Sequence, residues 1–86
     1  MVTSAGTLPA PLCLYVREGC PLCDEFLVDL SADLGPGMAA LAIIDVDGDP
    51  ALALRVGLRV PVLEAAGAVV FEGRYDRNRV RQALRL

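Results

Sequence analysis

Two cysteines separated by two residues are the part of the sequence best suited to chemistry. They are Cys20 and Cys23, within the stretch EGCPLCDEF at residues 18–26. Residues three apart on a helix have Cβ atoms roughly 5–6 Å apart, so a small adjustment closes a disulfide between them. By residue type alone, the pair is a redox dithiol, part of a metal site or two ordinary core thiols.

The two thiols occupy different positions in the expected helix. Pro21 suits the first helical turn, where its missing N–H is not needed, so Cys20 lies at the start of the helix. Unpaired backbone N–H groups and the positive end of the helix dipole stabilise a thiolate there. Cys23 lies one turn further, at the head of an apolar stripe, and should stay more protonated. This asymmetry favours an exchange in which Cys20 attacks a substrate disulfide and Cys23 resolves the mixed disulfide.

The elements that position the cysteines have the predicted order β-α-β-α-β-β-α. We expect a strand at residues 12–16, a helix from Pro21 to the Gly-Pro-Gly at 35–37, a strand at 40–46, a helix at about 50–56, strands at 60–64 and 68–73, and a last helix capped by Asp76. The first and second strands are apolar runs typical of strands buried on both faces. The first βαβ unit requires parallel strands, and a C-x-x-C motif beside it is typical of a thioredoxin-like redox site.

Length, composition and charge exclude several classes of protein. The chain has 86 residues, of which 55% are hydrophobic, enough for one small domain at residues 12–86 after a loose leader at 1–11. The net charge of −3 argues against nucleic-acid binding, and no apolar run approaches the roughly 20 residues of a membrane span. The N-terminus lacks the features of a signal peptide. We therefore expect a cytoplasmic monomer, in which paired cysteines are more often catalytic or metal-binding than structural.

A second candidate feature is the Val60–Pro61 dipeptide at the start of a predicted strand. Bonds before proline are the only peptide bonds for which the cis form is cheap. A cis Pro61 beside the cysteines would leave the backbone of Val60 unpaired, and an extended substrate chain could add there as a further strand. We therefore expect Val60 and Pro61 to form a docking edge.

Together these features resemble a known family. CPLC follows the first predicted strand, IDVDGDP follows the second, VPVL marks the third and GRYD precedes the last helix. With this spacing, residues 12–86 resemble glutaredoxin-like proteins of the thioredoxin fold, and more narrowly small bacterial glutaredoxin-like proteins of uncertain function. The resemblance implies a four-stranded mixed sheet with helices on both faces and a thiol–disulfide oxidoreductase activity. By that resemblance, Cys20 is the nucleophile, Cys23 the resolving thiol and Pro61 the cis proline.

The resemblance also implies a binding site for glutathione as a co-substrate. The residues would be Arg17 just before the motif, the backbone of Val60, and the segment 73–76, in which Asp76 opens the last helix. Tyr75 in this segment would flank a substrate groove or cover the core. No further cofactor is expected.

Charge around the motif bears on the choice of partner. Glu18, Asp24 and Glu25 lie next to the cysteines, and only Arg17 opposes them. Nearby carboxylates disfavour a thiolate and repel anionic glutathione, although they suit a helix N-terminus. We therefore expect Cys20 to be less acidic than a typical glutaredoxin nucleophile, and a disulfide-containing protein to fit better than glutathione.

Two other functions are compatible with the sequence. One is a non-catalytic binding module that keeps the thioredoxin fold and has lost efficient exchange. The other is a metal-bridged dimer, because a structural zinc site needs four Cys or His ligands and this chain has no histidine and one further cysteine, Cys13. We expect no metal site, and we expect Cys13 to fill the core, since free cysteine is among the most buried residue types.

Overall fold

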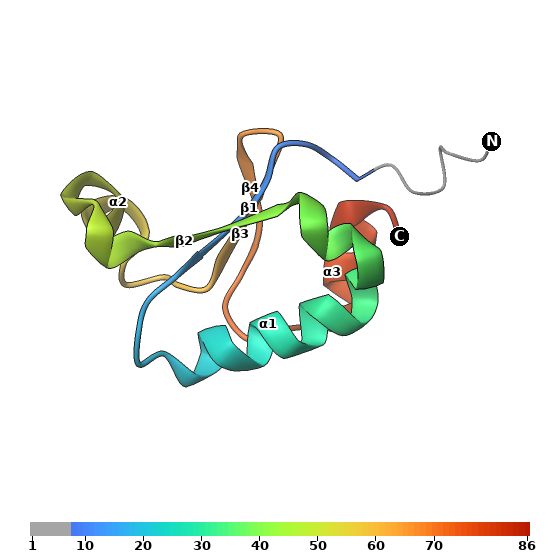
Figure 1. Ribbon diagram of the computed structural model, residues 1–86, viewed down its shortest axis with the longest axis horizontal. Helices are drawn as coiled ribbons and strands as arrows, with labels where there is room; N and C mark the ends of the chain where they lie inside the picture. The colour runs from blue at the N-terminus through green and yellow to red at the C-terminus, as the bar shows by residue number, and fades with distance from the viewer. Residues whose placement is uncertain (1–7) are drawn as a thin grey trace.

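The computed structural model describes residues 8–86, in which strands and helices follow the predicted order (Figure 1). The elements are β1 (Leu12–Val16), α1 (Pro21–Leu34), the 3₁₀ helix η2 (Gly35–Ala40), β2 (Leu41–Asp45), the 3₁₀ helix η3 (Val46–Gly48), α2 (Pro50–Val56), β3 (Val62–Ala65), β4 (Ala68–Glu72) and α3 (Arg77–Leu84). The predicted thioredoxin-like α/β fold is confirmed. Residues 1–7 of the predicted leader lie outside the described part, and Leu8 in its remainder packs against the core. The division into leader and domain stays a prediction.

The sheet is mixed, as predicted, with the strand order β2-β1-β3-β4. Strand β1 runs parallel to β2 and antiparallel to β3, and β3 is antiparallel to β4. In this register Leu14 of β1 lies between Ile43 of β2 and Leu63 of β3. The hairpin between β3 and β4 turns at Ala66 and Gly67, whose φ angles are 53° and 84°. Positive φ at both positions is typical of a tight two-residue hairpin.

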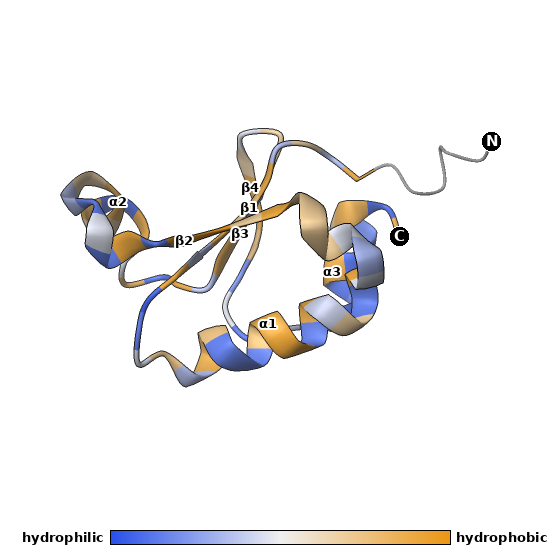
Figure 2. Cartoon of the chain, in the orientation of Figure 1, coloured by the Kyte–Doolittle hydropathy of each residue, from blue (hydrophilic) through white to orange (hydrophobic). Residues whose placement is uncertain are grey.

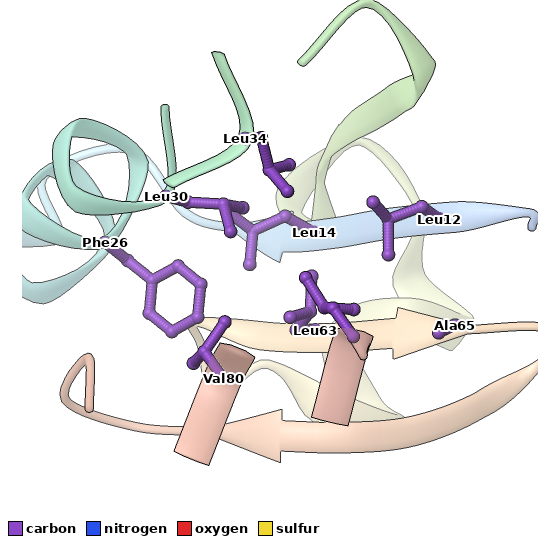
Figure 3. Packing of buried hydrophobic residues seen from close by; sticks show 9 residues of the cluster. Leu12, Leu14, Phe26, Leu30, Leu34, Leu63, Ala65 and Val80 are labelled. Atoms are coloured by element: carbon purple, nitrogen blue, oxygen red, sulfur yellow. The ribbon is translucent and has the colours of Figure 1, made fainter. Parts of the chain in front are cut away.

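The main core lies between one face of the sheet and the helices α1 and α3 (Figure 3). Side chains alternate across a strand, so Leu12 and Leu14 of β1 point to this face while Tyr15 points to the other. Helix α1 contributes the apolar stripe that begins at Cys23. The buried members of the cluster are Leu12, Leu14, Phe26, Leu30, Leu34, Leu63, Ala65, Val80 and Leu84.

Helix α2 covers part of the opposite face. A smaller buried cluster joins Tyr15 of β1 and Val62 of β3 to Val46 of η3 and Val56 of α2. Figure 1 shows α2 at the end of the sheet toward which β1 and β2 run. Helices therefore flank both faces, but within residues 8–86 no helix covers the other end of this second face.

The prediction that residues 40–46 form a strand buried on both faces is wrong. Strand β2 is an edge strand in which Ala42 is exposed and Ile43 is 52% exposed, although Figure 2 shows it apolar along most of its length. An apolar run shows which residue types a strand contains, but it does not show how many strands and helices pack against that strand. The prediction that Cys13 fills the core is also wrong. Cys13 is half-buried and belongs to neither buried cluster.

Candidate dithiol site

Cys20 is the N-cap residue of α1. Its backbone is extended, with φ −109° and ψ 98°, and its carbonyl accepts hydrogen bonds from the N–H groups of Cys23 (3.0 Å) and Asp24 (3.1 Å). The Cys20 Sγ accepts a further bond from the N–H of Cys23, at 3.1 Å. A serine or aspartate oxygen usually fills this role. Because Pro21 is the first helical residue, the helix begins directly after Cys20.

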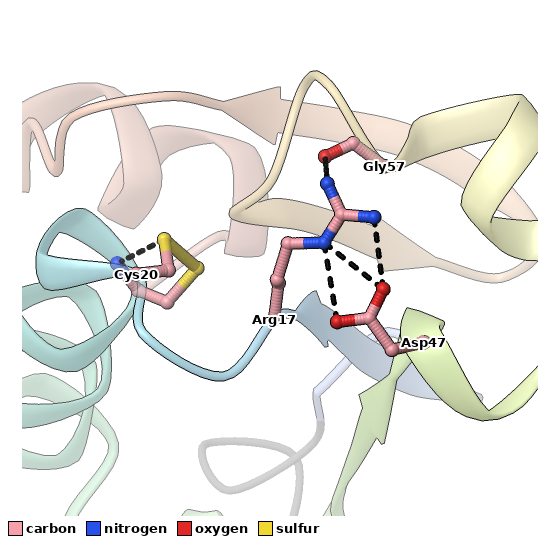
Figure 4. The surroundings of a disulfide bond; sticks show 5 residues. Arg17, Cys20, Asp47 and Gly57 are labelled. Carbon is pink, nitrogen blue, oxygen red and sulfur yellow. Dashed lines mark hydrogen bonds and ion pairs between the residues drawn. A yellow bond between two sulfur atoms is a disulfide. The ribbon is translucent and has the colours of Figure 1, made fainter.

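Cys23 lies one turn further along α1 and faces the core. It is 1% exposed, whereas Cys20 is half-buried. The two Cα atoms are 5.2 Å apart, and the sulfur atoms form a disulfide (Figure 4). Of the two sulfur atoms, that of Cys20 is therefore the one which an incoming molecule can reach.

Arg17 follows β1 and lies between the strand and the motif. Its guanidinium binds the carboxylate of Asp47 through Nη2 (2.8 Å) and Nε (3.1 and 3.2 Å), and Nη1 donates to the carbonyl of Gly57 at 3.1 Å (Figure 4). The hydrogen bond and the negative charge of Asp47 raise the pKa of Arg17 further. Within residues 8–86, none of its hydrogen bonds goes to a cysteine. Arg17 thus links the end of β1 to η3 and to the end of α2.

The expectation that Arg17 alone opposes the carboxylates of the motif is wrong. Arg17 pairs with Asp47, and a different cation, Arg74, lies 3.6 Å from Glu25. Glu18 and Asp24 are exposed and form no ion pair in the part of the chain that the structure describes. Neither the Arg17–Asp47 pair nor the Arg74–Glu25 pair was predicted from the sequence, because the fold alone brings the partners together.

The peptide bond between Val60 and Pro61 is cis. Pro61 is buried, and its carbonyl accepts a hydrogen bond from the N–H of Gly73 at 3.0 Å. Pairing of β3 with β1 begins only at Val62, opposite Tyr15. Among residues 8–86 the backbone of Val60 forms no hydrogen bond. It therefore offers free polar groups directly before the first paired residue of β3.

Tyr75 and Asp76 each have a structural role. The Tyr75 hydroxyl donates to Asp33, and its ring meets Phe26 edge-on, with ring centres 4.9 Å apart. Burial, together with this bond to Asp33, raises the pKa of Tyr75. The Asp76 carboxylate caps α3 by accepting from the N–H of Arg79 at 3.2 Å. Their expected contacts with substrate, like those of Arg17, stay predictions.

A buried carboxylate on the second face of the sheet was not anticipated. Glu64 of β3 is 9% exposed and accepts a hydrogen bond from the Tyr15 hydroxyl at 2.9 Å. Arg55 of α2 lies 3.4 Å from Glu64 and 5.6 Å from the centre of the Tyr15 ring. Burial and the bond to Glu64 raise the pKa of Tyr15. The one sign of this buried carboxylate in the sequence is a glutamate at the end of an apolar run. The contact between Arg55 and Glu64 joins α2 to the sheet.

Residues 8–86 contain neither a metal site nor a membrane span of the kinds considered below. No three His, Cys, Asp or Glu side chains gather closely enough to hold a metal ion. In the same residues, no helix is both long and apolar enough to cross a membrane.

The fold and the site define a thioredoxin-fold domain with a dithiol at the start of its first helix. A comparison with protein-family models matches residues 11–85 to the glutaredoxin-like domain (DUF836), and the chain belongs to this family. The predicted resemblance is therefore confirmed.

Two solved structures have the same fold. The first, structural genomics target protein XcR50 from X. campestris, is 38% identical, with a TM-score of 0.67 over 83% of this chain and 91% of that one. The second, protein Ne2328 from Nitrosomonas europaea, is 31% identical, with a TM-score of 0.73 over 88% of this chain and 92% of that one. Among curated proteins, no significant match was found.

Proposed function

We propose that this glutaredoxin-like protein is a thiol–disulfide oxidoreductase. The observation that carries the proposal is the unequal pair at the start of α1. Cys20 is half-buried and its sulfur atom accepts the N–H of Cys23, while the Cys23 side chain is buried and bonded to it. After reduction, the same N–H group and the helix dipole favour the thiolate of Cys20.

The exchange takes place in two steps. The Cys20 thiolate attacks one sulfur atom of a substrate disulfide, which breaks that bond and releases the other sulfur atom as a thiolate. Cys23, on losing its proton, then attacks the Cys20 sulfur atom of the mixed disulfide and releases the second substrate thiol. Two electrons pass from the protein to the substrate, and the Cys20–Cys23 disulfide forms.

The docking edge for the substrate is the backbone of Val60 beside Pro61. Its unpaired polar groups precede β3, and an extended chain can bind there as an added strand. The substrate is a disulfide-containing protein or glutathione, and the protein needs no resident cofactor. We further propose that the protein acts as a monomer in the cytoplasm, where paired cysteines are usually catalytic and form only transient disulfides.

A redox titration in glutathione buffers tests the proposal. Free thiols are trapped by alkylation and identified by mass spectrometry at each potential. We expect one two-electron transition for the Cys20–Cys23 pair, and in the Cys23→Ser variant we expect Cys20 to be trapped as a mixed disulfide. Cys13 is an internal control, since it is also half-buried but lies on a strand.

The rate of alkylation separates the proposal from its alternatives. In the reduced protein at neutral pH, Cys20 should react much faster than Cys13, because only Cys20 lies at a helix N-terminus. Equally slow alkylation of all three cysteines, with no disulfide at any potential, would leave a non-catalytic binding module. A metal ion that co-purifies with a dimer would favour the metal-bridged form.

A further inference from the structure

Two leucines at the end of α2 are almost completely exposed. Leu54 is 90% exposed and Leu58 is 98% exposed. The helical hydrogen bonding continues past Val56, since the N–H of Gly57 donates to Ala53 O at 2.9 Å. Gly57 keeps helical backbone angles, with φ −58° and ψ −32°, so Leu58 follows one turn after Leu54, just past the end of α2. Single exposed leucines are ordinary, but two that lie one turn apart are not explained by the fold.

The turn that carries Leu58 is tied to the segment that leads to the dithiol. The carbonyl of Gly57, directly before Leu58, accepts a hydrogen bond from Arg17 at 3.1 Å. Arg17 precedes Cys20 by three residues, which limits their Cα separation to about 11 Å. Leu58 also precedes the proposed docking edge, Val60 and Pro61, by only two residues. Figure 1 shows α2 and the start of α1 at the same end of the sheet.

The charges around the site restrict the partner. Glu18 and Asp24 are exposed and unpaired among the described residues. The arginines that flank the leucines are engaged, because Arg59 pairs with Glu72 at 2.9 Å and Arg55 with Glu64 at 3.4 Å. Arg17 is likewise held by Asp47. Arg74 is paired with Glu25 at 3.6 Å. Within residues 8–86, an anionic molecule such as oxidised glutathione thus meets the unpaired carboxylates of Glu18 and Asp24 and no unpaired arginine beside them, whereas a basic segment is attracted.

We propose that Leu54 and Leu58 dock a protein substrate, with an apolar side chain on the leucines and basic residues beside its disulfide. The proposal rests on the proposed function, because it names the substrate class of the same dithiol. The leucines contribute apolar contact area, and the carboxylates select the charge of the partner. The substrate backbone between these two contacts lies along Val60, so that its disulfide reaches the sulfur atom of Cys20.

Three probe disulfides test the proposal with the pre-reduced protein in single turnovers. Two are cyclic peptides closed by one disulfide, one carrying Arg and Leu around it and the other carrying Glu and Ser. The third is hydroxyethyl disulfide, which is small and neutral. We expect the Arg/Leu peptide to be reduced about tenfold faster than the Glu/Ser peptide, and we expect added salt to narrow the difference.

The double variant Leu54→Ser/Leu58→Ser isolates the contribution of the leucines. It should lose the part of the Arg/Leu peptide's rate advantage that remains at high salt, and it should reduce hydroxyethyl disulfide at the wild-type rate. The matched control is Ile43→Ser/Val69→Ser, which removes two exposed apolar side chains from the edge strands β2 and β4. This control should keep the advantage of the Arg/Leu peptide.

Several results would overturn the proposal. An undiminished advantage in the leucine variant, or oxidised glutathione reduced as fast as the Arg/Leu peptide, excludes this substrate class. A wild-type dimer that the leucine variant abolishes in sedimentation assigns the surface to a second copy of the chain. If the wild-type protein does not reduce hydroxyethyl disulfide, the proposed oxidoreductase function is wrong, and the docking proposal is wrong with it.

Discussion

Replacing Asp33 by alanine should destabilise the protein by about 2 kcal/mol. The Asp33 side chain is 7% exposed near the end of α1 and accepts hydrogen bonds from the Tyr75 hydroxyl and from Arg77 Nε, the latter at 3.1 Å. Arg81 Nη1 lies 3.5 Å away. One carboxylate thereby joins α1 to α3 and to the segment before it.

The magnitude follows from the exposure of the three partners. The side chains of Arg77 and Arg81 are 56% and 43% exposed, so they regain water when the carboxylate is lost, and each ion pair contributes at most about 1 kcal/mol. The Tyr75 hydroxyl loses a charge-assisted bond in a partly buried site, which costs about 1.5–3 kcal/mol. For a domain of this size, a loss of about 2 kcal/mol lowers the Tm by roughly 10 °C.

Urea unfolding of the oxidised protein, followed by circular dichroism, measures the change. The control is Asp29→Ala, because Asp29 lies one turn earlier on α1 and forms no hydrogen bond or ion pair with any residue that the structure describes. Its removal should change the free energy of unfolding by less than about 0.5 kcal/mol. Equal losses in the two variants would refute the reasoning, because they would assign the effect to helix α1 in general.

The same comparison has a predicted dependence on pH. Burial raises the pKa of Asp33, but the bonds from Tyr75 and Arg77 and the charges of Arg77 and Arg81 outweigh it, and the pKa is lowered overall. Because the folded pKa lies below the unfolded one, the carboxylate stabilises fully above about pH 4 and loses its contribution as the pH falls through the folded pKa. The stability gap between wild type and Asp33→Ala should therefore be constant near neutral pH and shrink in acid.

Two further substitutions test the packing and the capping of the helices. Leu30→Ala removes a completely buried side chain of α1 and should cost about 2–5 kcal/mol in urea unfolding, whereas Val28→Ala, 68% exposed on the same helix, should cost under about 0.5 kcal/mol. Asp49→Ala removes the carboxylate that accepts from the N–H of Ala51 at 2.9 Å at the start of α2, and should cost about 1 kcal/mol, while Asp49→Asn keeps an acceptor and most of the stability.

The helices could be predicted from the sequence because their signals are local. Asp49 and Asp76 accept hydrogen bonds from N–H groups two or three residues away, and Pro21 has no N–H for the first turn of α1 to leave unpaired. All three helices begin where these residues placed them. The burial of β2 could not be predicted in this way. It depends on which strands become neighbours and on how far the short helix α2 reaches, and both are set by contacts between distant segments.

The same distinction applies to the candidate site. The spacing of Cys20 and Cys23 is local, and so is the helix start that makes their environments unequal. The electrostatic environment is not local, because the partner of Arg17 lies thirty residues away at Asp47. From the sequence alone, Arg17 reads as a free cation next to the motif, available to a glutathione carboxylate.

The fold brings Arg17 and Asp47 together, and this changes what the site attracts. A bidentate pair with an additional bond to the Gly57 carbonyl leaves little of the Arg17 charge for a ligand. The carboxylates of Glu18 and Asp24 then dominate the approach to Cys20, which disfavours anionic disulfides more strongly than the sequence indicated. If the proposed exchange takes place, we therefore expect its substrate choice to depend less on the dithiol motif than on pairing between charges far apart in the chain.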